Sequence, residues 1–189
     1  MRRRPPPRPT APILLVVVLL LTGACGSPAP GRPQSPPGVV AAAAEFGGTD
    51  LAWVELMIPM DEQLLPVLDL VRERSADPGL VGLAGDLRGV YDAELPRLRG
   101  LSAAAKLPSD NPHKGHKMPG LVDADRLAAM RAASGADFER QATDCLREHL
   151  DQLARLAGAE VANGTSPSVK DLARQVEQNR AAASARLPK

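Results

Sequence analysis

Apolar residues recur every three or four positions along most of the chain from residue 45 onward, which is the spacing of amphipathic helices. The first two apolar stripes comprise Trp53, Met57, Met60, Leu64, Val67 and Val71, and then Leu80, Leu83, Leu87, Tyr91, Leu95, Leu98 and Leu101. The sequence Asp77-Pro78-Gly79 between them predicts a turn. Pro59 and Pro66 lie within the first stripe, and each removes a helical hydrogen bond, so we expect a kink in the first helix.

The second half of the chain carries two further stripes of the same kind. They comprise Phe138, Ala142, Cys145, His149, Leu153 and Leu156, and then Val169, Leu172, Val176, Ala183 and Leu187. Residues 163–167 between them predict a turn, with Ser166 or Ser168 as the capping residue of the last helix. Residues 106–121 contain three prolines and two glycines and are predicted to form a loop, and we expect a short helix after Asp123.

The two halves of the chain match each other at a fixed offset of 89 residues. The matching pairs include Gln63 and Gln152, Leu64 and Leu153, Pro78 and Pro167, Leu83 and Leu172, Ala84 and Ala173, and Arg97 and Arg186. Two helical hairpins with one apolar face each can bury those faces only against each other. The sequence therefore predicts an all-α fold, an up-and-down four-helix bundle with repeats at about residues 45–105 and 123–188.

Aromatic residues make up only 2% of the chain, so the core must consist mainly of Leu, Val and Ala, which favours helices over a β-sandwich.

The N-terminus has the order of an export signal. Residues 1–12 carry four arginines, residues 13–21 are an unbroken apolar run, and Gly23-Ala24-Cys25 follows. This run is too short to cross a bilayer core of about 30 Å as a helix. The cut site resembles the bacterial lipobox, so we predict a lipoprotein signal peptide over residues 1–24 and lipidation of Cys25. Because Thr22 replaces the usual Leu of that motif, ordinary cleavage after Ala24 and an uncleaved short anchor are the alternatives.

Residues 25–38 are predicted to be the lipidated Cys and a Pro-rich tether that leads into the folded domain at residues 39–189. A diacylglycerol supplies two acyl chains such as palmitate, and two chains hold a protein on a membrane. We therefore expect attachment to the extracytoplasmic face of the cell membrane.

The formal net charge of +1 includes the four arginines of the signal, and without them it is −3. This charge, with no basic patch interleaved with aromatic residues, argues against a nucleic-acid partner.

The repeat, the sequence Met-Ile-Pro-Met-Asp-Glu-Gln at residues 57–63, the Asp77-Pro78 turn and the loop from His113 to Pro119 together resemble a known family. It is the bacterial domain-of-unknown-function family 305, and the resemblance covers about residues 45–188. It implies a ferritin-like fold and, because some members are associated with copper handling in the envelope, a metal-related role. Typical members carry His-His where this chain has Met60-Asp61, and again where it has His149-Leu150, so one of these four histidines is present.

Two groups of side chains are candidate copper ligands. Cys145 lies one helical turn before His149, so both point the same way, and the repeat brings Met57, Met60 and Asp61 of the first helix near them. The alternative is that these residues fill the core and that His149 is a hydrogen-bonded, half-buried histidine.

The second group lies in the loop, which we call the His/Met loop (residues 106–121). It offers His113, His116 and Met118 within six residues, and Gly115 lets the backbone fold so that they converge. Lys114 and Lys117 oppose a cation there, and the alternative is a solvated connector. We expect weak copper binding centred on this loop.

Enzymatic motifs are missing from the sequence. It has no Glu-x-x-His pair of a di-iron bundle, no nucleophile elbow and no phosphate loop. Most carboxylates lie between arginines on helical faces, where we expect them to be solvated. We therefore predict a non-enzymatic binding or accessory protein of the envelope, with weak copper binding. The alternative is a metal-free helical scaffold that contacts another envelope protein.

Overall fold

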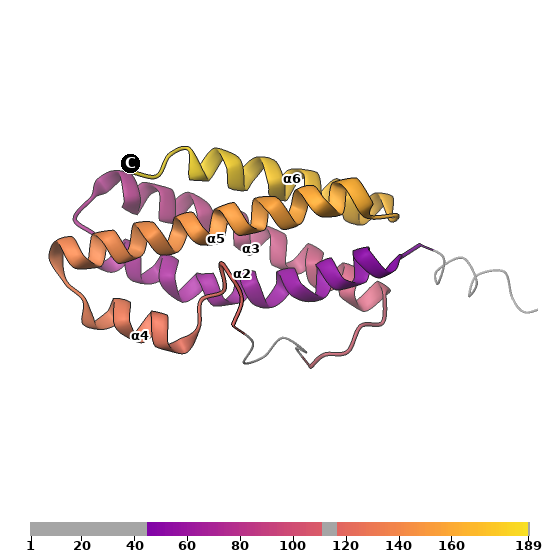
Figure 1. Cartoon of the computed structure of the whole chain (residues 1–189), viewed down its shortest axis with the longest axis horizontal. Coiled ribbons are helices and arrows are strands. Elements are labelled where there is room, and N and C mark those ends of the chain that lie inside the picture. The colour runs from indigo at the N-terminus through magenta and orange to yellow at the C-terminus, as the bar shows by residue number, and fades with distance from the viewer. Residues whose placement is uncertain (1–44, 111–116, 189) are drawn as a thin grey trace, which may run out of the picture. The chain divides into compact units, whose positions relative to one another are not determined.

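Five helices make up the part of the chain that the computed structural model describes, residues 45–110 and 117–188, all within one unit of the chain, Ser35–Lys189. In chain order they are α2 (Gly48–Arg74), α3 (Pro78–Ala104), α4 (Ala124–Ala132), α5 (Gly135–Asn163) and α6 (Pro167–Ser184) (Figure 1). No strand occurs in these described residues, and the short helix α4 begins directly after Asp123 as expected. The all-α prediction is confirmed.

The four long helices form two hairpins, because α2 packs mainly on α3 and α5 mainly on α6 (Figure 1). A carboxylate near the start of each hairpin holds the turn of the other. Asp50 of α2 accepts from Ser166 N at 3.0 Å, and Glu139 of α5 accepts from Ala76 N at 2.7 Å. Asp50 and Glu139 are 89 residues apart, so these contacts follow the offset of the repeat.

These two contacts also fix the directions of the helices. The start of α5 lies at the α2–α3 turn, so α3 and α5 run the same way, and α3 ends at the end of the bundle opposite to the one where α5 begins. One long crossover is typical of ferritin-like bundles. The predicted four-helix bundle of two repeated hairpins is therefore confirmed, but the order is not simply up-and-down, because α3 and α5 run in the same direction.

The helix ends differ from the prediction at one point. α3 begins as expected at Pro78, where the Asp77 carboxylate accepts from Gly79 N at 2.7 Å. Ser166 precedes α6 but its side chain makes no cap hydrogen bond, and its hydroxyl lies 3.0 Å from that of Ser168. The Asp50 carboxylate accepts from Ser166 N, just before the helix. Helix α2 is continuous through Pro59 and Pro66.

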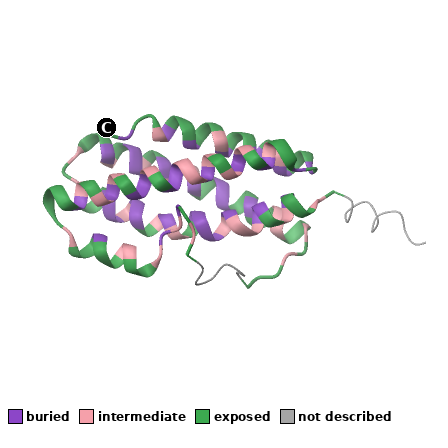
Figure 2. Ribbon diagram, viewed as in Figure 1, coloured by how far each residue is buried: buried purple, intermediate pink, exposed green. Residues whose placement is uncertain are grey.

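Buried residues lie on the inward faces of the helices (Figure 2). The apolar ones form two clusters. One cluster lies toward the α2–α3 turn and includes Leu64, Leu83, Cys145 and Leu150. The other lies toward the α5–α6 turn and includes Trp53, Met57, Met60, Leu153 and Val176.

Four carboxyl groups are exceptions to the expectation that carboxylates lie mostly on solvated faces. Asp50, Asp61, Glu94 and Glu160 are all at most 5% exposed. Helical spacing places all four on inward faces, and each has a local means of losing or balancing its charge, as described below.

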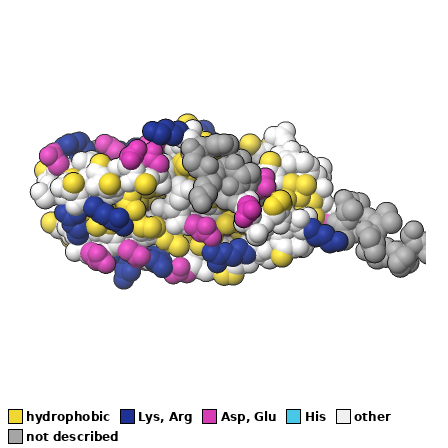
Figure 3. All heavy atoms as spheres, turned by 90° about the horizontal axis from the view of Figure 1, so that it is seen from below, with side chains coloured by type: hydrophobic (Ala, Val, Ile, Leu, Met, Phe, Trp, Pro, Cys, Tyr) yellow, Lys and Arg dark blue, Asp and Glu magenta, His cyan; other side chains and the backbone are white. Residues whose placement is uncertain are grey.

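The surface carries the remaining charges, and Figure 3 shows acidic and basic side chains interspersed on one face. Representative ion pairs are Arg88 with Asp69 at 2.5 Å and Arg186 with Asp86 at 2.8 Å. Such exposed pairs typically stabilise a protein by about 0–1 kcal/mol each. Within the described residues, no helix is both long and apolar enough to span a membrane.

Candidate functional site

A layer of polar side chains crosses the middle of the bundle between the two apolar clusters. We call it the polar layer: Asp61 of α2, Tyr91 and Glu94 of α3, His149 of α5 and Arg180 of α6. All five are at most 5% exposed. Each helix of the bundle contributes at least one of them, so the layer joins the two hairpins at their centre.

Arg180 holds one side of the polar layer together. Its Nη2 donates to Glu94 Oε1 at 2.7 Å and to Asp61 Oδ1 at 3.3 Å. Its Cζ lies 4.0 Å from the centroid of the Tyr91 ring, a cation–π contact that is strong when it is desolvated. One guanidinium thus faces two carboxyl groups and an aromatic ring.

His149 holds the other side. Its Nδ1 lies 2.8 Å from the carbonyl oxygen of Gly120, which can only accept, so Nδ1 carries the proton. Its Nε2, 2.9 Å from the Tyr91 hydroxyl oxygen, must then accept from that hydroxyl. Both nitrogens of the only candidate histidine in the bundle are therefore used in hydrogen bonds.

Gly120 reaches His149 because it is a glycine. Its φ is +77°, in the left-handed region, and a Cβ there would lie 2.7 Å from Gln152 Cβ and 3.2 Å from Glu148 O. Gly120 N also donates to Glu148 Oε1 at 3.3 Å, and Glu148 is paired with Arg126 at 2.6 Å. The C-terminal end of the His/Met loop is thereby fixed to α5.

Burial determines the protonation of the polar layer. Burial, together with the charges of Arg180 and Arg126, lowers the pKa of His149 to about 3, against the opposing effect of the Gly120 hydrogen bond. Burial and the negative charge of Glu94 raise the pKa of Asp61 well above its ordinary value, against the opposing effect of Arg180. A neutral Asp61, with Glu94 on the shorter bond to Arg180, leaves the layer without net charge.

The structure places the predicted ligands in different surroundings. Met57, Met60, Asp61, Cys145 and His149 are all fully buried, whereas Met118 is partly exposed. Cys145 lies in the opposite apolar cluster from Met57 and Met60. His113 and His116 lie outside the described residues.

The polar layer does not fit a metal ion. A cation beside Asp61 would lie next to the Arg180 guanidinium in a low-dielectric interior, where like charges repel strongly. His149 would have to give up one of its two hydrogen bonds. Burial raises the pKa of Cys145 to about 11, so its sulfur is a protonated thiol and not the thiolate that metals prefer.

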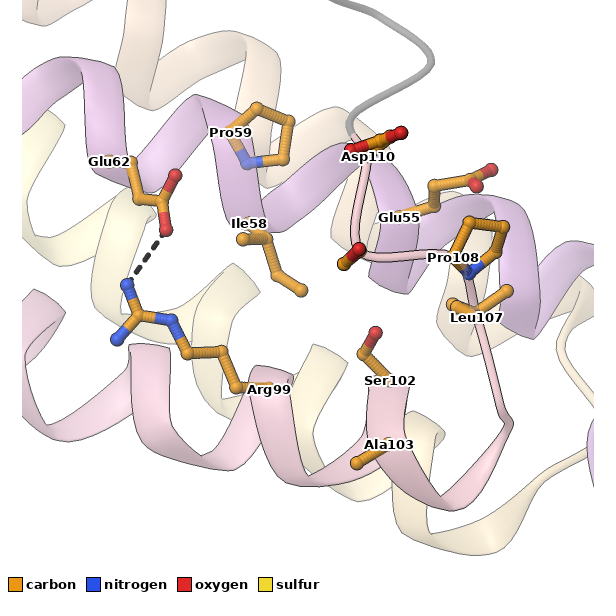
Figure 4. Close-up of a pocket in the computed structure, with 11 residues that line it drawn as sticks. Glu55, Ile58, Pro59, Glu62, Arg99, Ser102, Ala103, Leu107, Pro108 and Asp110 are labelled. Atoms are coloured by element: carbon orange, nitrogen blue, oxygen red, sulfur yellow. Dashed lines mark hydrogen bonds and ion pairs between the residues drawn. The ribbon is translucent and has the colours of Figure 1, made fainter.

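A surface hollow of about 350 Å³ lies where α2, the end of α3 and residues 107–110 meet (Figure 4). An ion pair of Arg99 with Glu62 at 2.7 Å lies at one side, and Glu55 and Asp110 lie at the other. Its floor is apolar, with Ile58 and Leu107. Among the described residues, none of the predicted copper ligands lines this hollow.

The sequence prediction missed Arg180 and Glu94, although a signal for each was present. Arg180 lies four residues after Val176 and three before Ala183, so it continues the fourth stripe, and it is 89 residues after Tyr91. Glu94 lies three residues after Tyr91 on the second stripe. Periodicity alone did not predict the burial of these two charged residues, because isolated charged side chains are rarely buried.

Comparison with known proteins agrees with this architecture. Residues 50–189 match the family model "Domain of unknown function (DUF305)". No relative was found among curated proteins. A DUF305 fragment from Deinococcus radiodurans superposes with a TM-score of 0.66 at 18% identity, covering 74% of this chain and 93% of that one.

Two further solved structures share the fold. A protein from Streptomyces coelicolor, named as a secreted DUF305 protein, has a TM-score of 0.63 at 22% identity, covering 72% of this chain and 88% of that one. CopM in its Cu(I)-bound form has a TM-score of 0.61 at 17% identity, covering 74% and 92%. At these identities the three structures establish the fold alone.

Proposed function

Because the chain belongs to the DUF305 family, we propose that it is a lipid-anchored accessory protein on the extracytoplasmic face of the membrane, with a non-enzymatic binding role. We further propose that it binds copper weakly, and that the ligands are His113, His116 and Met118 of the His/Met loop. The bundle then acts as the support that positions this loop.

One observation carries the choice of the loop over the bundle. In the polar layer both nitrogens of His149 are engaged by Gly120 and Tyr91, and Oδ1 of Asp61 is engaged by the Arg180 guanidinium, whose positive charge opposes a metal ion beside it. Met118 is partly exposed, two residues from the fixed Gly120, so it lies at a supported and accessible end of the loop. Imidazole and thioether donors suit copper better than magnesium or calcium. The shared fold of Cu(I)-bound CopM supports the choice of metal.

The test is a copper titration of the full chain against a competing chelator, with Cu(I) and Cu(II) separately. Replacing His113 and His116 together by Ala is expected to abolish most of the binding. Replacing Lys114 and Lys117 together by Ala is the matched control, and it should leave binding equal or tighter because two opposing charges are removed. If the His variant binds like the wild type, the loop is not the site.

The anchor has its own test. Cys25→Ala is expected to move the protein from the membrane fraction to the soluble or secreted fraction, because no thioether to a lipid can form. Cys145→Ala is the control, and it should remain with the membrane. A Cys25→Ala protein that stays in the membrane would indicate an uncleaved helix instead.

A second candidate function is a metal-free helical interaction protein of the envelope. The observation that favours it is Arg180, because the bundle supplies its own interior cation and needs no metal to balance Asp61 and Glu94. The copper titration separates the two candidates. If the chain binds copper no more tightly than a scrambled loop peptide does, the copper-binding role is wrong and the metal-free interaction protein is favoured.

A further inference from the structure

A second pair of buried carboxyl groups lies at the end of the bundle where α2 begins and α5 ends. The pair consists of Asp50, which is fully buried, and Glu160, which is 1% exposed. It shares no residue with the polar layer, and Asp50 and Asp61 are about three helical turns apart on α2. No arginine donates to either carboxyl group among the hydrogen bonds of the described residues.

Asp50 is surrounded by donors. Its Oδ2 accepts from Gly47 N at 2.6 Å and from the Thr165 hydroxyl at 2.8 Å. Its Oδ1 accepts from Thr165 N at 3.1 Å and from Ser166 N at 3.0 Å. One carboxylate thus joins the residue before α2 to the turn between α5 and α6.

Glu160 is in the opposite situation. Neither of its carboxyl oxygens has a hydrogen-bond donor in the described part of the chain, although both are buried. It lies against Asp50, because a Cβ on Gly164 would overlap Glu160 Oε1 and would lie only 2.8 Å from Asp50 Oδ1. Two ionised carboxylates cannot stay so close in a buried site without a neutralising partner.

We infer that Asp50 and Glu160 bind one proton between them, and that losing this proton with rising pH loosens the α5–α6 turn from the start of α2. The proton sits on Glu160, so that its O–H group can donate a hydrogen bond to Asp50. A metal ion is a poor alternative, because the N–H and O–H groups around Asp50 present their positive hydrogens to the space a cation would need.

The charges around the pair agree with this assignment. Burial, a hydrogen bond that the protonated Glu160 donates to Asp50, and the charge of Asp50 raise the pKa of Glu160 to about 8, against the opposing charge of Lys170 on α6. Burial alone would raise the pKa of Asp50, but its hydrogen bonds outweigh burial and lower the pKa to about 2. Glu45, which accepts from the Ser168 hydroxyl at 3.3 Å, and Asp171 near the start of α6, paired with Arg174, are further acidic groups at this end of the bundle.

The direction of the pH effect follows from linkage. Between the ordinary carboxyl pKa of 4.5 and a folded-state pKa of about 8, the folded protein holds a proton that the unfolded chain has released. The stability that Glu160 contributes is fully present below pH 4.5 and is lost as the pH rises toward 8. The unfolding equilibrium constant should therefore rise by up to about tenfold per pH unit in this window.

The test compares the full chain with Glu160→Gln in chemical unfolding from pH 5 to pH 9. Gln keeps the shape and a donor of the protonated side chain but cannot titrate, so the part of the pH dependence that Glu160 causes should disappear. Glu73→Gln on the exposed side of α2 is the matched control and should keep the wild-type pH dependence. Carbon-13 NMR of the Glu160 carboxyl group in the wild type provides a second measurement that needs no variant.

The expected NMR result is a Glu160 titration between pH 7 and pH 9, with Asp50 ionised throughout. A Glu160 that titrates near pH 4.5 would overturn the inference, and so would a Glu160→Gln variant with the same pH dependence as the wild type. Neither measurement involves copper or the lipid anchor, so its outcome is independent of the proposed function.

Discussion

The polar layer and the Asp50–Glu160 pair both bury two carboxyl groups, and they balance the charge in different ways. In the polar layer, the Arg180 guanidinium lies between Asp61 and Glu94. In the pair, backbone and hydroxyl donors surround Asp50, and we infer that a proton neutralises Glu160. In the polar layer a permanent cation balances Glu94, while Asp61 holds a proton, whereas the charge balance of the Asp50–Glu160 pair depends on a proton alone.

This difference separates two structural roles. A guanidinium stays charged at any physiological pH, so the polar layer keeps its central contact between the hairpins under all ordinary conditions. A shared proton exchanges with solvent, so the pair is a contact that can be released. The permanent contact lies at the centre of the bundle, and the releasable one lies at the end, where opening disturbs only a turn and a helix start.

The largest loss of stability is expected when the permanent cation, Arg180, is removed. Arg180→Met keeps an unbranched side chain but leaves the Glu94 carboxylate buried without a partner. Breaking a buried ion pair in this way typically destabilises a protein by about 3–5 kcal/mol. The measurement is the free energy of unfolding by urea at pH 7.

The companion variant removes the whole charged set, with Asp61→Leu and Glu94→Leu added to Arg180→Met. Replacing buried ionic groups by apolar ones is often neutral or stabilising, so this variant should recover most of the lost stability. A triple variant as unstable as Arg180→Met alone would mean that packing, and not charge, explains the effect.

The next effect concerns acid, which should weaken the polar layer through His149 but should strengthen the Asp50–Glu160 pair by keeping Glu160 protonated. The folded-state pKa of His149 is lowered from 6.5 to about 3, so its contribution to stability is fully present above pH 6.5 and is lost as the pH falls toward 3. At pH 4 the expected loss is about 3 kcal/mol. The raised pKa of Asp61 acts in the opposite direction, so the His149 effect must be isolated by comparison.

That comparison uses His149→Gln, which can donate and accept but cannot titrate in this range. Its free energy of unfolding should decrease less than that of the wild type between pH 7 and pH 4. Equal decreases in the two proteins would show that His149 is not held neutral by Gly120 and Tyr91.

A smaller effect is expected at the releasable contact. Asp50→Asn places an amide NH₂ against a group of donors, so at least one buried donor loses its acceptor, at about 1–3 kcal/mol. The repeat provides a matched control in Glu139→Gln, because Glu139 accepts from Ser75 and Ala76 at the other turn but is only half-buried. If both variants lose the same stability, burial does not distinguish the two turns.

The sequence predicted the bundle well because apolar periodicity and the 89-residue repeat are properties of the chain itself. The repeat also held for the polar contacts, since Asp50 and Glu139 bond to opposite turns. It did not predict the polar layer, because the burial of Arg180 depends on Asp61, Glu94 and Tyr91, which lie on two other helices. Periodicity identifies an inward position but does not say which partners meet a charge there.

The smallest effect on stability is expected for an exposed ion pair, and it is the reference with which the buried variants are compared. Arg186 pairs with Asp86 at 2.8 Å, but the two side chains are 51% and 67% exposed. Water and salt screen such a pair, so Arg186→Gln should change the free energy of unfolding by about 1 kcal/mol or less. Arg180 and Arg186 lie on the same C-terminal stretch of the chain and each bonds a carboxylate, so they differ mainly in burial. If Arg186→Gln destabilised the protein as much as Arg180→Met, the cost of Arg180→Met could not be attributed to the burial of an unpaired charge.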